Sequence, residues 1–224
     1  MMLSAVDTCT VVLEKGDRTG VEAFVVIPPM VYGRGTGFGN KISIQFVAIV
    51  RIGRDAGSAY KVADDSHVGR FCSFVETDAD SLFSKFQDWP MCHLDDLVSL
   101  YTTLIILIVE NKPTPCNTAG GYYLAENGLF NWNALSRSIA VSLHRHHLVK
   151  DPTLVEASWK ELEKMGTILG CPKEFVPISI AGECRSFRAG NAGLLGWRPV
   201  YGLDHLMGAI EGEVDFVLRE DRQS

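Results

Sequence analysis

The sequence predicts an α/β fold, on the basis of one strongly apolar segment and several amphipathic helices that alternate with short strands. Residues 21–27 (VEAFVVI) are almost continuously apolar and rich in β-branched side chains, which is typical of an interior strand in a parallel sheet. Apolar residues at helical spacing recur along much of the remaining chain. With 224 residues, of which 46% are hydrophobic and 21% charged, the chain is long enough to bury a core of its own.

Each further element is predicted from local spacing and from capping or turn residues. We expect helices over residues 4–15, 41–54, 94–108, 131–143, 154–169 and 203–218. Short strands are expected over residues 60–63, 122–125 and 176–180. An aspartate, Asp95 or Asp96, can cap the third helix, and Asn131 can cap the fourth. Residues 71–88 show no clear period, and Gly33, Gly35, Gly37 and Gly39 mark a polar loop.

The charge balance excludes several classes of partner. There are 21 basic and 27 acidic residues, which gives a net charge of −6 and no basic tract. Nucleic acid and anionic membranes are therefore not expected as partners. The longest apolar run, residues 104–109, is too short to cross a bilayer, and we expect no signal peptide in the amino-terminal residues. We expect a cytoplasmic protein whose partner is a small molecule.

Several motifs that would bind a metal or a nucleotide can be set aside. The six cysteines are scattered singly, so neither a zinc site nor a disulfide framework is expected. Gly190, Gly193 and Gly196 have dinucleotide-like spacing but do not follow a predicted strand, and we interpret them as turn glycines. No tyrosine is followed four residues later by a lysine. The histidines at 144, 146 and 147 fit a solvated helix end. Neither a cofactor nor a metal is therefore expected.

His93 is the candidate for acid–base chemistry. It lies at a helix start, with Asp95 and Asp96 two and three residues later. A histidine oriented by a neighbouring aspartate can act as a general acid or base near neutral pH. The alternative is that an aspartate caps the helix while His93 is only packed. Tyr32 is the second polar group that could take part in proton transfer.

Three segments together resemble a known family. Residues 25–33 (VVIPPMVYG), 92–97 (CHLDDL) and 195–199 (LGWRP) occur in the order found in the NAD-dependent epimerase/dehydratase family of extended or atypical short-chain dehydrogenases. The chain is most similar to fungal nucleoside-diphosphate-sugar-epimerase-like members. The resemblance implies that residues 1–40 are a remnant of a Rossmann-type half and that residues 41–224 form the substrate-binding half, with mixed helices and short strands. It also implies that the part bearing the dinucleotide-binding turn and the tyrosine–lysine pair is missing.

The resemblance also assigns roles to individual positions. The loop after the first strand would border the substrate, and an arginine near residue 185 would face it. The implied substrate-binding residues are Pro28, Pro29, Met30, Arg34, Arg185 and Arg188. Compared with the family, residues 71–88 look inserted, either as a lid or as translated intron sequence.

These implications leave three functions open. The first is a non-redox enzyme of fungal secondary metabolism that uses His93 and Tyr32 in isomerisation, elimination or cyclisation of an apolar, polyketide- or terpene-like metabolite without a bound dinucleotide. The second is a truncated NAD(P)-dependent oxidoreductase or epimerase that needs a partner chain, for example a homodimer that covers the exposed sheet edge. The third is a small-molecule-binding protein without catalysis.

Overall fold

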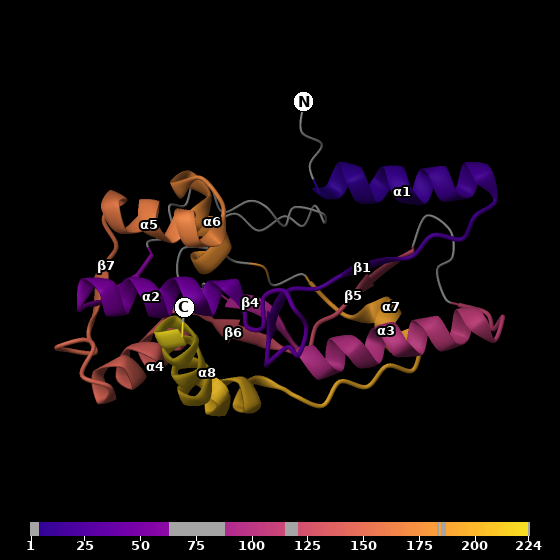
Figure 1. Cartoon of the computed structure of the whole chain (residues 1–224). Helices are drawn as coiled ribbons and strands as arrows, with labels where there is room; N and C mark the ends of the chain where they lie inside the picture. The colour runs from indigo at the N-terminus through magenta and orange to yellow at the C-terminus, as the bar shows by residue number, and fades with distance from the viewer. Residues whose placement is uncertain (1–4, 63–87, 115–120, 183, 185–186, 224) are drawn as a thin grey trace, which may run out of the picture.

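The computed structural model describes residues 5–62, 88–114, 121–182, 184 and 187–223. Figure 1 shows helices grouped around short strands at two ends of the molecule. The helices of the described residues are α1 (Ala5–Thr19), α2 (Ile44–Ala56), α3 (Leu94–Val109), α4 (Trp132–Arg145), α5 (Trp159–Leu169), η1 (Lys173–Phe175), α6 (Val176–Ala181), α7 (Gly190–Leu194) and α8 (Leu203–Gln223). None of these helices combines the length and the apolar character that a membrane crossing needs.

The strands of the described residues are short and form small sheets. They are β1 (Val25–Ile27), β2 (Met30–Tyr32), β3 (Ala59–Lys61), β4 (Asp88–His93), β5 (Tyr122–Leu124), β6 (Leu129–Asn131) and β7 (Leu154–Glu156). β1 pairs with β5, and β3 pairs with β7, both in parallel. β4 lies between β2, to which it is parallel, and β6, to which it is antiparallel. The α/β class is therefore confirmed.

Two hydrophobic cores hold these elements together. The larger core lies among α2, α4, α5, α6 and α8 and includes residues of β2 and β4. The smaller core lies among β5, α3 and α7, with β1 side chains packed against it. The expected division at residue 40 stays a prediction, and the smaller core combines residues from both sides of it. Residues 71–87 of the expected insertion lie outside the described part of the chain.

The helices with clear periodicity form where the sequence predicts them. In α4 the side chains of Trp132, Leu135, Ile139 and Leu143 are each at most 1% exposed, as the spacing indicates. The Asn131 side chain accepts hydrogen bonds from the backbone N–H groups of residues 133 and 134, which confirms its predicted role as the cap. α8 buries Leu206, Ile210, Val214 and Val217. These helices form one wall of the larger core.

Three expected elements are wrong. The helix expected over 154–169 is a strand, β7, followed by α5, because Ser158 caps a helix that begins only at Trp159. The strand expected over 176–180 is the helix α6, which places Val176 and Ile180 in the larger core one turn apart. The strand expected over 21–27 contains only Val25–Ile27, and these residues are half-buried rather than interior.

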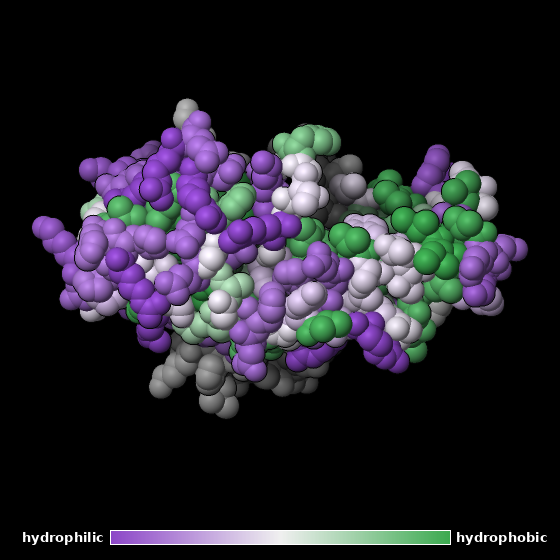
Figure 2. All heavy atoms as spheres, turned by 60° about the horizontal axis from the view of Figure 1, so that its bottom comes forward, coloured by the Kyte–Doolittle hydropathy of each residue, from purple (hydrophilic) through white to green (hydrophobic). Residues whose placement is uncertain are grey.

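Helix α3, near β1 and β5, has apolar side chains that the other described residues leave exposed. In the view of Figure 1, α1 lies above β1 and β5 and α3 lies below them. α3 buries Leu97, Leu100 and Leu104. A second row of its side chains is exposed, which we call the α3 stripe: Val98, Tyr101, Ile105 and Ile108. Figure 2 shows apolar side chains gathered over this end of the molecule.

The cysteines are not all in the same state. Cys9, Cys92 and Cys171 are free thiols. Cys184, in contrast, is disulfide-bonded. The backbone N–H of Cys184 also donates to the carbonyl oxygen of Asp88 at 2.9 Å, which attaches this residue to the start of β4.

Candidate functional site

Residues of the three motif segments meet at the end of β4. Tyr32 ends β2 and His93 ends β4, and parallel pairing places the two residues side by side. The rings of Tyr32 and His93 are 4.9 Å apart, centroid to centroid. Tyr201 and His205 complete an aromatic cluster, with their ring centroids 4.2 and 5.1 Å from that of His93. The site thus joins β2, β4 and the start of α8.

His93 caps helix α3 with its own side chain. Its Nδ1 accepts a hydrogen bond from the backbone N–H of Asp95 at 3.2 Å, so neither of the following aspartates is the cap. This contact leaves the proton of the neutral imidazole on Nε2. Burial, partly opposed by Asp95 and Asp96, lowers the pKa of His93 below its ordinary value. His93 is therefore a neutral ring at physiological pH.

Gly33 packs directly against the other edge of this ring. Its φ angle of 96° lies in the left-handed region, which favours glycine. A Cβ atom at this position would lie 2.5 Å from Nε2 of His93. The first glycine of the loop is thus required by the position of the histidine ring.

The hydroxyl of Tyr32 is directed into the protein. The side chain is only 1% exposed. Its Oη lies 3.1 Å from the carbonyl oxygen of Tyr201, to which it donates, and 3.3 Å from Nδ1 of His205. Burial raises the pKa of Tyr32 far above its ordinary value, with a smaller contribution from the Asp96 charge. Tyr32 therefore stays protonated and fixes the segment that precedes α8.

Asp96 forms the polar centre of the site. Its side chain is 3% exposed, and its two carboxylate oxygens accept from the backbone N–H groups of Val200 and Tyr201 at 2.9 and 3.0 Å. Its carbonyl oxygen accepts from Nε1 of Trp197 at 3.0 Å. Asp96 thus attaches residues 197–201 to the start of α3, across about one hundred residues of sequence.

The predicted substrate-binding residues occupy different environments. Pro28 is exposed and Pro29 half-buried, whereas Met30 is buried in the larger core. Arg34 donates to the carbonyl oxygen of Gly212 in α8, and Arg188 is exposed and donates to a neighbouring carbonyl. Arg185 lies outside the described residues. Pro28 and Pro29 thus precede β2, which ends at Tyr32, and the described arginines make their hydrogen bonds to backbone carbonyls elsewhere.

The set-aside motifs have local structural roles. Gly190 and Gly193 belong to the five-residue helix α7, which follows an irregular segment rather than a strand. His144 lies 3.1 Å from the carbonyl oxygen of Val149, and Nε2 of His146 lies 2.8 Å from Asp215. Within the described parts of the chain, no three histidine, cysteine, aspartate or glutamate side chains are grouped as metal ligands would be.

Part of this site was predictable from the sequence, and part was not. Tyr32 and His93 were polar candidates in the sequence, and their catalytic roles stay predictions. The role of Asp96 in holding the distant segment was not predicted, nor were Tyr201 and His205. The signal available for Asp96 was a second aspartate at a helix start, where one cap suffices. The signal for Tyr201 was its position two residues after the 195–199 motif.

Comparisons with known proteins give matches only among solved structures. No family model matches the chain, and no curated protein matches it. RMD from Pseudomonas aeruginosa complexed with NADPH matches at 14% identity and a TM-score of 0.47, covering 94% of this chain and 54% of that one. L-threonine dehydrogenase from Phytophthora infestans matches at 14% identity and a TM-score of 0.49, with the same coverage. L-threonine 3-dehydrogenase from Trypanosoma brucei matches at 15% identity and a TM-score of 0.46, and the match covers 98% of this chain and 55% of that one. This chain thus spans about half the length of these structures.

Proposed function

We propose that this chain is the substrate-binding part of a dinucleotide-dependent oxidoreductase or epimerase of the short-chain dehydrogenase type. In this proposal the sheet that binds the dinucleotide belongs to protein outside residues 1–224. One observation carries the proposal. The segments 25–33, 92–97 and 195–199, far apart in sequence, meet through the Tyr32–His93 pairing and the hydrogen bonds of Asp96 and Trp197. Segments that matched the family only by chance would have no reason to form one site.

The smaller core supports the idea of a sheet completed from outside. Among the described residues β1 pairs with β5 and with no other strand. A two-stranded sheet is marginally stable by itself. Each residue of the α3 stripe, next to this sheet, is at least 40% exposed, although apolar side chains at helical spacing are usually buried. Additional strands beside β1 would give both the strand edge and the stripe a partner.

The described residues do not fit a dinucleotide. Its pyrophosphate needs a glycine turn that leads directly from a strand into the amino terminus of a helix. Residues 187–189, the described residues directly before α7, do not form a strand. The loop after β2 ends at Gly39, five residues before α2 begins, and Arg34 within this loop is bound to α8 instead. We therefore assign no step of hydride transfer to residues of this chain.

The residues of the site have positioning roles in this proposal. The neutral ring of His93 caps α3, and the hydroxyl of Tyr32 donates its hydrogen bond to the carbonyl oxygen of Tyr201. The Asp96 carboxylate fixes the segment before α8. These contacts create a rigid support at the end of β2, whereas Pro28 and Pro29, where the resemblance expects substrate, precede the start of this strand. The substrate itself would bind where this support meets the missing sheet.

Calorimetric titration of the purified chain with NADH and NADPH tests the proposal. We expect no saturable binding up to about 1 mM, the upper end of ordinary Michaelis constants. One-to-one binding in the micromolar range would contradict it. Turnover of an apolar metabolite without any dinucleotide, lost in His93→Ala, would instead favour the non-redox enzyme of fungal secondary metabolism.

A homodimer is the other way in which the edge of β1 could be covered. Light scattering coupled to size exclusion separates the two cases. We expect a monomer, or a concentration-dependent association that is weakened by Ile105→Ser on the α3 stripe. A stable dimer that Ile105→Ser leaves intact would place the subunit contact elsewhere.

A further inference from the structure

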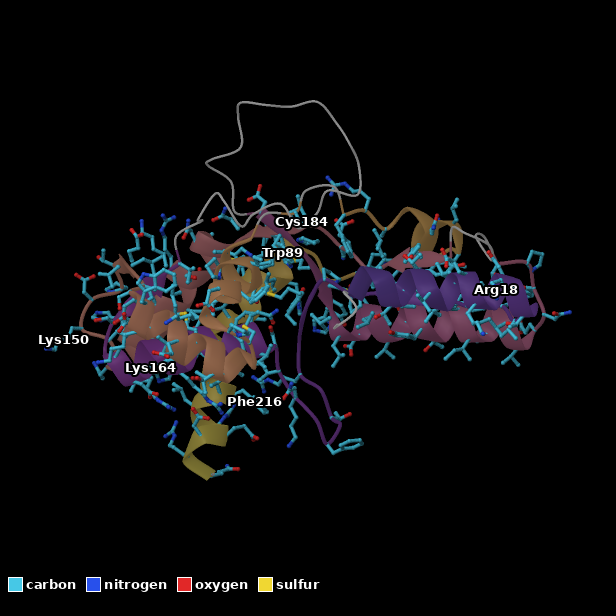
Figure 3. All side chains as sticks on the ribbon, turned by 90° about the horizontal axis from the view of Figure 1, so that it is seen from above. Arg18, Trp89, Lys150, Lys164, Cys184 and Phe216 are labelled. Atoms are coloured by element: carbon cyan, nitrogen blue, oxygen red, sulfur yellow. The ribbon has the colours of Figure 1, made fainter. Side chains whose placement is uncertain are left out.

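A groove of about 410 Å³ lies between the glycine loop, α2 and α8, away from the site at His93. Its apolar wall consists of Ile42, Ile44, Val47, Ile168, Phe216 and Val217. Figure 3 shows Phe216 on α8 beside the loop that joins β2 to α2. The volume falls within the range of about 300–1,000 Å³ that is typical of small-molecule sites. The groove is therefore large enough for a small ligand with an apolar body.

Phe38 is placed to cover this groove. It contributes to the lining, yet its side chain is completely exposed, at 108% of the reference area. Gly37 and Gly39 flank it, and a Cβ atom added to either glycine would meet nothing within 4 Å. Both glycines flanking Phe38 therefore border open space. Covering a bound apolar molecule would remove both the ring and the ligand from water, which is favourable.

The charges of the groove favour one negative group. Lys41 lines the groove and makes no ion pair with any described residue. Arg51 also lines it, but its guanidinium already binds the carboxylate of Asp221 at 2.5 Å. Glu220 is a third charged residue of the lining. Lys41 is thus the cation available to a ligand.

We propose that this groove binds a small molecule with an apolar body and a single carboxylate, with the carboxylate at Lys41 and Phe38 closing over the apolar part. A medium-chain carboxylate has this chemistry. The inference goes beyond the proposed function and does not depend on it, because the groove uses none of Tyr32, His93 or Asp96. The chain could bind such a molecule whether or not a dinucleotide-binding sheet joins it.

Titration with octanoate and with octylammonium, which share the apolar chain but differ in charge, tests the proposal. We expect saturable one-to-one binding of octanoate and weaker binding of octylammonium. Lys41→Gln should weaken octanoate binding about two- to fivefold and remove the preference for the anion, as an exposed ion pair allows. Val47→Trp, which fills the groove, should abolish binding. Equal affinity for both probes, or unchanged octanoate binding in Val47→Trp, would overturn the site.

Closure by Phe38 has its own readout. Phe38→Ala should weaken octanoate binding roughly tenfold, which corresponds to the loss of one buried aromatic contact. Phe38→Trp should show a blue shift of its emission when octanoate is added. The matched control is Ile105→Ser on the α3 stripe, which should leave octanoate affinity unchanged. If Ile105→Ser weakens binding, or if the emission of Phe38→Trp does not shift at saturation, the proposal is overturned.

Discussion

Replacing Asp96 by asparagine should destabilise the protein more than any other isosteric change at the site. Each backbone N–H bond to a charged acceptor contributes about 1.5–3 kcal/mol. The carboxylate of Asp96 accepts two such bonds, from Val200 and Tyr201. Asparagine keeps one accepting oxygen and turns an NH₂ group toward the other backbone donor. We therefore expect the free energy of unfolding to fall by about 2–4 kcal/mol.

Urea unfolding followed by tryptophan fluorescence measures this loss, since Trp197 donates to the carbonyl oxygen of the same residue. Asp95→Asn is the matched control. The Asp95 side chain is 70% exposed and lies 3.7 Å from His93, so its replacement should change stability by less than about 0.5 kcal/mol. Equal unfolding free energies for Asp96→Asn and Asp95→Asn would refute the role given to the buried carboxylate.

Three further predictions concern the surroundings of this carboxylate. Gly33→Ala should cost about 1–3 kcal/mol, because φ is positive there and the new methyl group meets His93, whereas Gly37→Ala should cost much less; urea unfolding of both variants checks this. Burial lowers the pKa of His93, so its neutral form contributes fully to the free energy of unfolding above about pH 6.5, and this contribution is lost as the pH falls through the pKa of the folded state. Urea unfolding at several pH values should show this loss in the native protein and not in His93→Asn, which can still cap α3. Burial also raises the pKa of Cys92 to about 12, so Ellman's reagent at pH 8 should modify the half-buried Cys171 while the native Cys92 stays unmodified.

Periodicity predicted the long helices because burial and spacing agree in them. In α4 and α8 the apolar residues recur every three or four positions, and the larger core buries these residues. In α6 the β-branched residues Val176, Ile178 and Ile180 suggest a strand, but Pro177 starts a helix that packs against the larger core. Tertiary packing here outweighs local preference.

The strands β3 and β5 form where the sequence predicts them, but β2 and β4 could not be predicted from sequence alone. β2 has three residues, and β4 contains Pro90, which normally argues against a strand. Pairing with distant partners determines both strands, and no local pattern encodes it. The strand β7 was missed for a related reason, since it has only three residues and leads into α5 after two more.

The candidate site was predictable only where its residues lie close together in sequence. His93 and its two aspartates stand within four positions, so sequence suggested a polar site there. The partners of Asp96 lie 104 and 105 residues away, and nothing in the local sequence indicates them. The sequence also suggested an aspartate as the cap of α3, whereas the cap is His93. A histidine can accept a hydrogen bond at a cap only when its ring is neutral, and burial, which lowers the pKa of His93, favours that form.

Hydrogen exchange on the isolated chain tests most directly the claim that the sheet of β1 and β5 is part of a larger one. We call β1, β5 and α3, which surround the smaller core, the smaller lobe, and the elements around the larger core the larger lobe. A lobe that is complete only with further strands should open more readily than the larger core. We predict that the amides of β1, β5 and α3 exchange with distinctly lower protection than those of α4 and α8. Equal protection in both lobes of the monomer would show that the smaller one is complete as it stands, and would contradict the account.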